Sequence, residues 1–190
     1  MENISVKENN NAHVCPHQIA FMLDNPIRRF FQNPKKLLEP YIQEGETVMD
    51  LGCGPGFFTI DMAKLVGSKG KVIAVDLQDK MLDHVRKKAK KHHIEDRIRF
   101  FKCEQGMAGF NQKAGFILAY YMVHEAPSSF QLLKELKNIL KDDGKVLIVE
   151  PKMHVKKTTF KRMLSEINEL GYRICGFPKN MGGHGVLISV

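Results

Sequence analysis

Three glycines at alternate positions follow a short apolar segment and stand beside a carboxylate. Gly52, Gly54 and Gly56 come directly after Val48–Leu51, in which Asp50 is the charged residue. Glycines let the backbone pass close to a ligand, and a helix that begins after such a turn offers unpaired N–H groups. The Asp50 carboxylate suits a cationic or hydrogen-bond-donating group, whereas it would repel a bare pyrophosphate. The segment therefore predicts a ligand-binding turn between a strand and a helix; the alternative is a tight turn without a ligand.

A second carboxylate follows at the end of the next apolar segment. Lys71–Asp76 ends in Asp76, 20 residues after Gly56. At this spacing α/β nucleotide-binding folds place an acid that accepts hydrogen bonds from ribose hydroxyls. Because the carboxyl ends of neighbouring parallel strands lie at one edge of a sheet, the turn and both acids are expected to converge. This arrangement favours a nucleoside-containing cofactor.

The glycine spacing argues against two other nucleotide sites. The dinucleotide fingerprint requires G-x-G-x-x-G, but Phe57 stands where its third glycine belongs. No Gly-Lys-Ser or Gly-Lys-Thr follows the turn, as a P-loop would require. A dehydrogenase and a P-loop nucleotide hydrolase are therefore disfavoured.

The residues after the fourth apolar segment, Phe116–Val123, offer acid–base chemistry. An unperturbed imidazole has a pKa of about 6.5, so His124 is the best candidate for a general base in the chain. Glu125 stands next to it and is expected to orient the ring. The alternative is that His124 or Glu125 simply caps the helix that begins near Pro127.

Short apolar segments alternate with longer amphipathic ones from residue 45 onward, and this alternation predicts an α/β fold. The apolar segments are nearly continuous, as in strands buried on both faces of a parallel sheet. Gly67, Gly70, Gly144 and Gly171 stand where the helices should end. The predicted strands are Thr47–Leu51, Lys71–Leu77, Ile98–Cys103, Phe116–Val123, Lys145–Val149 and Gly185–Val190, and the predicted helices are Phe57–Val66, Lys80–His92, Ser128–Leu140 and Lys156–Leu170.

The first part of the chain differs in composition from the rest. Prolines divide it into three predicted short helices, Ile19–Leu23, Ile27–Phe31 and Pro34–Tyr41. Apolar residues between Phe21 and Phe31 make this part too apolar for a free tail. We expect residues 1–36 to form a helical arm or lid that covers the acceptor pocket.

Length and charge set broader limits. The chain has 190 residues, 43% of them hydrophobic, and 29 Lys+Arg against 21 Asp+Glu give a net charge of +8. This profile predicts a soluble domain that favours anionic partners without naming one. The basic run Arg86–His93 wraps around a helix end, where cations suit the helix dipole, so nucleic acid stays open as a partner but is not favoured. No apolar run is long enough to span a membrane, and Met1–Asn11 is polar, so we expect no membrane segment and a cytoplasmic location.

The cysteines and histidines do not form a metal-binding pattern. A cluster around Pro16 has Cys15 between two histidines, but the proline interrupts it and no fourth ligand lies near. The chain has no C-x-x-C pair, so we expect free thiols and no metal. The four cysteines are Cys15, Cys53, Cys103 and Cys175.

Three segments together resemble the class I S-adenosylmethionine-dependent methyltransferases, in particular their small methyltransferase-domain members. They are Val48–Gly56, Ala74–Leu77 and Leu140–Pro151, and the resemblance extends over residues 37–190. It implies an α/β, Rossmann-like seven-stranded sheet, mostly parallel, with helices on both faces. The last strand, Gly185–Val190, would run antiparallel beside a strand near Tyr172–Phe177. Residues 37–190 would then form an S-adenosylmethionine-binding domain.

The same resemblance implies a role for each site residue toward S-adenosylmethionine. The turn with Asp50 would hold the methionine part, Asp76 would accept hydrogen bonds from both ribose hydroxyls, and Leu77 would lie against the adenine. Glu104 would accept a hydrogen bond from the adenine amino group, with one of its two sequence neighbours sharing that task; the alternative is a solvated loop carboxylate. The implied cofactor residues are Asp50, Gly52, Cys53, Gly54, Gly56, Asp76, Leu77, Glu104, Gln105 and Tyr120.

The acceptor is expected to be a small molecule. Methyl transfer from a sulfonium requires an in-line acceptor and excluded water, and it requires a base only where the acceptor holds its proton. Residues 124–127 lack the Asp/Asn-Pro-Pro-aromatic pattern of enzymes that methylate exocyclic amino groups, and no cysteine has the setting needed for carbon-5 of cytosine. The alternatives are an RNA or protein methyltransferase that uses the basic surface and a catalytically silent cofactor-binding protein.

Overall fold

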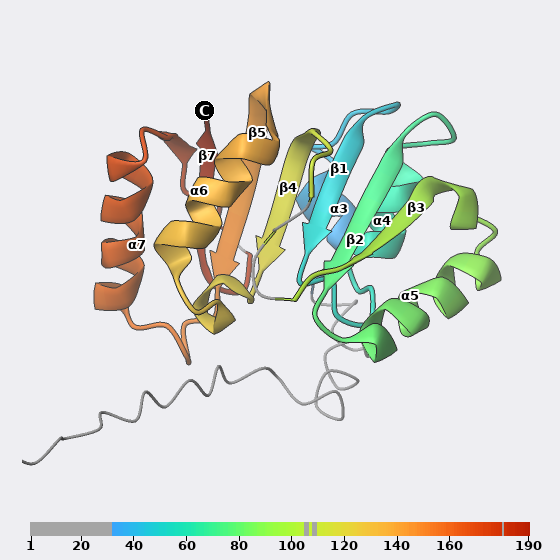
Figure 1. Cartoon of the computed structure of the whole chain (residues 1–190), viewed down its shortest axis with the longest axis horizontal. Helices are drawn as coiled ribbons and strands as arrows, with labels where there is room; N and C mark the ends of the chain where they lie inside the picture. Colours follow the sequence, from blue (N-terminus) through green and yellow to red (C-terminus); the bar gives the residue numbers. More distant parts are fainter. Residues whose placement is uncertain (1–31, 105–106, 108–109, 180) are drawn as a thin grey trace, which may run out of the picture.

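The computed structural model of the chain describes residues 32–104, 107, 110–179 and 181–190. It contains a seven-stranded sheet in the order β3-β2-β1-β4-β5-β7-β6 (Figure 1). The first five strands pair in parallel, and β7 runs antiparallel to both of its neighbours. The predicted mostly parallel sheet with an antiparallel last strand is confirmed. The strands are β1 (Thr47–Leu51), β2 (Lys71–Asp76), β3 (Ile98–Lys102), β4 (Ala114–Tyr120), β5 (Leu140–Glu150), β6 (Arg173–Gly176) and β7 (His184–Ser189).

Helices cover both faces of this sheet, as predicted. Side chains of α3, α4 and α5 pack in one hydrophobic cluster, and those of α6 and α7 pack in another on the opposite face (Figure 1). The helices are α3 (Pro34–Leu38), α4 (Thr59–Leu65), α5 (Asp79–Lys91), α6 (Ser129–Ile139) and α7 (Lys157–Glu169), with 3-10 turns η2 (Glu95–Arg97) and η3 (Val123–Glu125).

Side-chain alternation along the central strands explains the two clusters. In β1, Val48 joins the cluster under α3, α4 and α5, whereas Met49 joins the one under α6 and α7. Phe116 and Ile117 divide in the same way along β4. Successive residues of a strand point to opposite faces, so a strand buried on both sides needs an apolar residue at nearly every position.

Two of the four predicted helix-ending glycines fulfil that role. Gly67 and Gly171 follow the last residues of α4 and α7 with φ of 67° and 72°, the left-handed conformation of a helix C-cap. The prediction was wrong for Gly70 and Gly144, which do not have positive φ. Gly144 lies inside β5, because Leu140 already pairs with Ala114 of β4 and the strand begins directly after α6.

The predicted helix Pro34–Tyr41 forms a shorter helix, α3. Its N-cap Asn33 accepts a hydrogen bond from the Lys36 N–H through its side chain, and Leu38 is buried in the core cluster shared with α4. The predicted helices Ile19–Leu23 and Ile27–Phe31, the proposed lid and the cluster around Pro16 lie outside the described residues. Within the described ranges, no helix is both long and apolar enough to cross a membrane.

Candidate functional site

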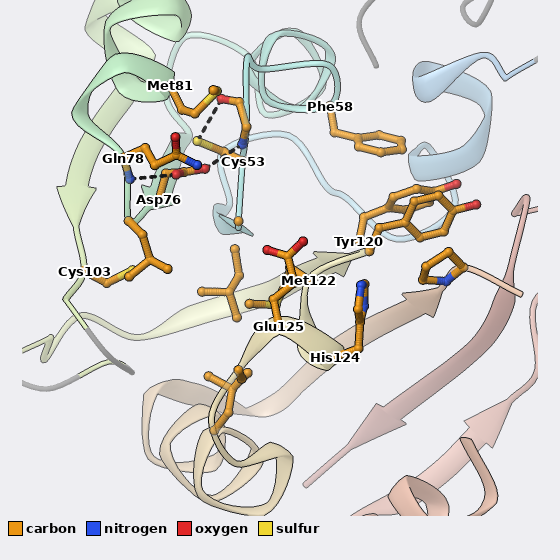
Figure 2. A pocket seen from close by; sticks show the side chains of 18 of the residues that line it. Cys53, Phe58, Asp76, Gln78, Met81, Cys103, Tyr120, Met122, His124 and Glu125 are labelled. Carbon is orange, nitrogen blue, oxygen red and sulfur yellow. Dashed lines mark hydrogen bonds between the residues drawn. The ribbon is translucent and has the colours of Figure 1, made fainter. Parts of the chain in front are cut away.

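A cavity of about 910 Å³ opens where β1, β2, β4 and β5 end. This volume lies within the range of roughly 300–1,000 Å³ that is usual for small-molecule sites. Figure 2 shows Cys53, Asp76 and Cys103 toward one end of it, and Tyr120 and His124 toward the other. The glycine turn and η3 therefore face one shared space.

The glycine turn has a backbone that other residues rarely adopt. Gly52, Gly54 and Gly56 have φ of 68°, 50° and 84°. A Cβ on Gly54 would meet no atom within 4 Å, whereas a Cβ on Gly52 would lie 2.8 Å from Cβ of Met122. Because both glycines line the cavity, the turn exposes bare backbone to a ligand at Gly54 and packs against the acceptor side at Gly52.

Asp76 closes this turn from the end of β2. Its Oδ2 accepts a hydrogen bond from the Gly54 N–H at 2.8 Å, and its Oδ1 accepts one from the Gln78 N–H at 2.9 Å (Figure 2). Burial raises the pKa of the carboxyl, and these backbone bonds oppose the shift. Each carboxylate oxygen can accept more than one hydrogen bond, so Asp76 retains acceptor capacity toward the cavity that it lines.

Asp50 and Gly56 lie behind the cavity wall and do not line it. Asp50 shares a strand face with Val48, and its Oδ2 accepts a hydrogen bond from the Thr59 hydroxyl at 2.6 Å. Burial raises the pKa of Asp50 to about 7 despite that bond. At Gly56 a Cβ would lie 3.0 Å from Cγ2 of Val85 in α5. Both residues thus attach the turn to α4 and α5.

Three more predicted cofactor residues line the same end of the cavity: Cys53, Leu77 and Glu104. Burial raises the pKa of the Cys53 thiol, which therefore stays neutral. Leu77 is 38% exposed, an apolar side chain turned toward open space. Gln105 lies outside the described residues. Met107 lines the cavity nearby, and its backbone N–H donates a hydrogen bond to Oε2 of Glu135 at 2.7 Å.

Tyr120, the last residue of β4, presents its ring to the cavity. The ring packs against Phe58 with a centroid separation of 4.5 Å. Its hydroxyl donates to the carbonyl of Met181 and accepts from Nε2 of Gln32. The tyrosine thus connects the end of β4 to the loop that precedes β7.

The η3 turn places His124 at the acceptor end. Nδ1 of His124 lies 2.6 Å from Oε2 of Glu150, whose Oε1 accepts a hydrogen bond from the Val123 N–H at 3.1 Å. The bond to Glu150 raises the pKa of His124, and partial burial opposes that shift. The side chain of His124 is 22% exposed and that of Glu150 is 2% exposed. A buried carboxylate therefore holds a half-buried imidazole at the cavity wall.

The structure corrects one expectation about this turn and adds a partner for His124. Ser128, not His124 or Glu125, caps α6, because its hydroxyl accepts the Gln131 N–H at 3.2 Å. Glu150 is hydrogen-bonded to the His124 ring, which was not predicted; Glu125 lines the cavity, and its charge also raises the pKa of His124. The sequence feature that could have pointed to Glu150 is its position as a single carboxylate directly after the predicted strand Lys145–Val149.

Two residues of the basic run Arg86–His93 make contacts within the domain. The guanidinium of Arg86 lies 4.5 Å from the centroid of the Phe100 ring and pairs with Asp83 at 2.7 Å. Nζ of Lys88 donates to the Pro55 carbonyl of the glycine turn at 2.5 Å.

Among the described residues, the three cysteines are free, and no group of three His, Cys, Asp or Glu side chains has the arrangement of a metal site.

Comparison with known proteins gives a consistent result. A family model described as a methyltransferase domain matches residues 42–176. A solved S-adenosylmethionine-dependent methyltransferase from Aquifex aeolicus is similar in structure, with a TM-score of 0.80, 25% identity, and coverage of 92% of this chain and 98% of that one. A structure from Methanococcus maripaludis shares the fold, with a TM-score of 0.71 and 19% identity over 100% of this chain and 96% of that one.

Curated relatives by sequence are methyltransferases with different acceptors in their names. The chain is 34% identical over 124 residues to a demethylmenaquinone methyltransferase of Lactobacillus johnsonii, covering 65% of this chain and 48% of that protein. It is 29% identical over 142 residues to a ribosomal protein L11 methyltransferase of Dictyoglomus turgidum, covering 73% and 42% respectively. The chain thus spans about half the length of the curated relatives it matches.

Proposed function

The chain belongs to the class I S-adenosylmethionine-dependent methyltransferase family, and on that premise we propose that it transfers the cofactor's methyl group to a small-molecule acceptor. The observation that supports this proposal is a single cavity lined both by the glycine turn with Asp76 and by the turn that carries His124. Cofactor and acceptor would meet inside it, which makes the transfer effectively intramolecular.

The cofactor end fits S-adenosylmethionine in charge and shape. The open face of Gly54 leaves room for the methionine part beside Cys53, and Asp76 has acceptor capacity for ribose hydroxyls. Leu77 offers an apolar surface to the adenine, and the exposed Glu104 carboxylate is an acceptor for its amino group. When bound, the cofactor supplies a methyl group already activated by the sulfonium charge. We propose that Gln105, the neighbour of Glu104 in sequence, shares the hydrogen bond to the adenine amino group. Tyr120 would lie next to the transferred methyl group.

The acceptor end fits an apolar small molecule. Tyr121, Met122, Ala126, Pro127 and Leu132 line it, so an acceptor with an apolar body would displace water from it. Here the chain would orient the acceptor and remove its proton, with His124 as the base. The demethylmenaquinone methyltransferases among the relatives are named for a small acceptor, which supports this choice.

The basic surface supports the second candidate function, methylation of RNA or protein, less well. Lys87, Lys90 and Lys91 are exposed on α5, but Arg86 and Lys88 already contact groups within the domain. The ribosomal protein L11 methyltransferase among the relatives is named for a protein acceptor. Steep salt dependence of RNA binding would favour this candidate.

Two measurements test the proposal in sequence. Calorimetric titration of the intact chain with S-adenosylmethionine and S-adenosylhomocysteine should show binding; no binding of either would refute the assignment. Labelled cofactor should then be incubated with metabolite extract, total RNA and cell protein in parallel. Label in a small molecule supports the proposal, label in a macromolecule supports the second candidate, and label in none would identify a silent binding protein.

A further inference from the structure

The carboxylate of Glu150 has both oxygens committed to the turn that carries His124. Oε1 accepts the N–H of Val123, and Oε2 lies 2.6 Å from Nδ1 of His124. An ionised carboxylate only accepts hydrogen bonds, so Nδ1 must carry the proton. In the neutral imidazole Nε2 then keeps its lone pair. One buried side chain thus fixes the backbone next to the histidine and the tautomer of its ring.

Glu150 acts from behind the cavity wall. Its side chain is 2% exposed and does not line the cavity, whereas His124 does. The titratable and charged groups facing this ring are Glu150 on β5, Glu125 on the same turn, and His154 on the loop after β5, whose ring centroid lies 5.9 Å away. Lys152 of that loop lines the same cavity. The buried carboxylate thus leaves Nε2 as the proton-accepting atom of a ring that lines the cavity.

Resting on the proposed function, we propose that Glu150 is a positioning residue that holds Nε2 of His124 as the proton acceptor, and that the methyl acceptor is a hydroxyl compound methylated on oxygen. A phenol-like hydroxyl has a pKa of about 10, so about one molecule in a thousand is ionised at neutral pH. An aromatic amine is neutral at this pH and attacks with its own lone pair, so it needs no base before transfer. A built base therefore matches a hydroxyl better than such an amine.

The proposed step balances without a further reactant. The acceptor oxygen forms a bond to the methyl carbon while the carbon–sulfur bond breaks, and that electron pair stays on sulfur as a neutral thioether. The hydroxyl proton passes to Nε2 of His124, which becomes an imidazolium paired with Glu150. Solvent then takes the proton, since the His124 side chain is 22% exposed.

The Glu150→Gln variant tests the pair directly. The Val123 N–H still needs an acceptor, so the amide oxygen will face it and the amide NH₂ will face His124. Nδ1 must then accept, and the neutral ring carries its proton on Nε2. Two-bond ¹H–¹⁵N NMR of the histidine rings should show the Nδ1–H tautomer in the wild type and the Nε2–H tautomer in the variant. A wild-type Nε2–H tautomer, or no change in the variant, would overturn the role of Glu150.

Controls separate this result from misfolding and from failure of the proposed function. The matched variant Glu166→Gln, in α7, should leave the His124 signals unchanged, and the His84 signals should not move in either variant. The tautomer is read without cofactor or acceptor, so it stands apart from the calorimetric test of cofactor binding. Both variants should keep cofactor affinity within about twofold; a larger loss in Glu150→Gln alone would assign Glu150 to cofactor binding.

Activity gives the second readout once an acceptor is found. A wrong-tautomer histidine should lower kcat by about 10²–10⁴-fold. The base must be unprotonated, so wild-type kcat/KM should rise with pH through the raised pKa of His124. In Glu150→Gln that limb should move to lower pH, because the bond that raises the pKa is gone. Product with the label on oxygen supports the acceptor class, and label on carbon or nitrogen would overturn it.

Discussion

The two ends of the cavity are built in different ways. At the cofactor end, backbone N–H groups and left-handed glycines make the surface, and the Gly54 N–H is bonded to Asp76, 22 positions further along the chain. At the acceptor end, side chains make the long-range bonds: His124 of η3 is bonded to Glu150 26 positions away, and the Tyr121 hydroxyl donates to the Gly182 carbonyl 61 positions away. The first end depends mainly on local backbone geometry, and the second depends on side-chain contacts between distant parts of the chain.

Removal of His124 should separate the two ends most sharply. We expect His124→Ala to lower kcat by about 10²–10⁴-fold, because a positioned base contributes about that much. Cofactor affinity should change by no more than about twofold, since His124 lies at the other end of the cavity. Turnover and calorimetry on the same preparation check this. A parallel fall in affinity and turnover would show that the two ends are one unit.

Removal of Asp76 should have the opposite signature. Asp76→Ala removes the acceptor for two backbone N–H groups and for the ribose, so we expect cofactor affinity to fall by about 30–1,000-fold, or about 2–4 kcal/mol. Asp79→Ala is the matched control, because Asp79 is 64% exposed and pairs with Lys102 on the surface. That control should bind within about twofold of the wild type. Equal losses in both variants would point to general charge rather than to the turn.

Gly52 tests the contact that joins the two ends. A Cβ there would lie 2.8 Å from Met122, and the φ of 68° disfavours any other residue. We expect Gly52→Ala to lower the free energy of unfolding by about 2–3 kcal/mol, from backbone strain and overpacking together. Gly54→Ala, with no atom within 4 Å, should lose only about 1 kcal/mol through strain. Denaturant unfolding measures both, and equal losses would mean that the Met122 contact yields easily.

Asp50 gives a small effect and a pH dependence of known sign. Its pKa is about 7 in the folded chain and about 3.9 when unfolded, so ionisation weakens the fold as pH rises between about 4 and 7. We expect Asp50→Asn to raise the free energy of unfolding by about 1–2 kcal/mol at pH 8, since lost charge-assisted bonds offset part of the linkage. At pH 4 the variant should match the wild type. A constant difference across this range would contradict the raised pKa.

The difference between the two ends also explains what the sequence could predict. The central strands were predictable within a few residues, because strands buried on both faces need continuous apolar runs such as Lys71–Asp76. The glycine turn and Asp76 were predictable because their spacing along the chain is fixed by the strand–turn–helix unit. The partner of His124 was not, because Glu150 reaches it only through the pairing of β4 with β5. Asp50 was placed on the cavity, whereas strand alternation puts it on the face of Val48.

The start of β5 was missed for a similar reason. Leu140 and Ala114 pair across the sheet before a register shift, and no local pattern signals that the strand begins as soon as α6 ends. Gly144 was therefore assigned to a helix end.

The loop before β7 lies in close contact with residues at the acceptor end of the cavity. A Cβ on Gly182 would lie 2.9 Å from the Tyr121 hydroxyl, and one on Gly183 would lie 2.2 Å from the Glu150 carbonyl oxygen. The loop between β6 and β7 thus packs against Tyr121, which follows β4, and against Glu150, the last residue of β5. Replacing Tyr121 would remove the hydrogen bond to the Gly182 carbonyl, so a change in the wall of the acceptor end would be felt in this loop, 61 positions further along the chain.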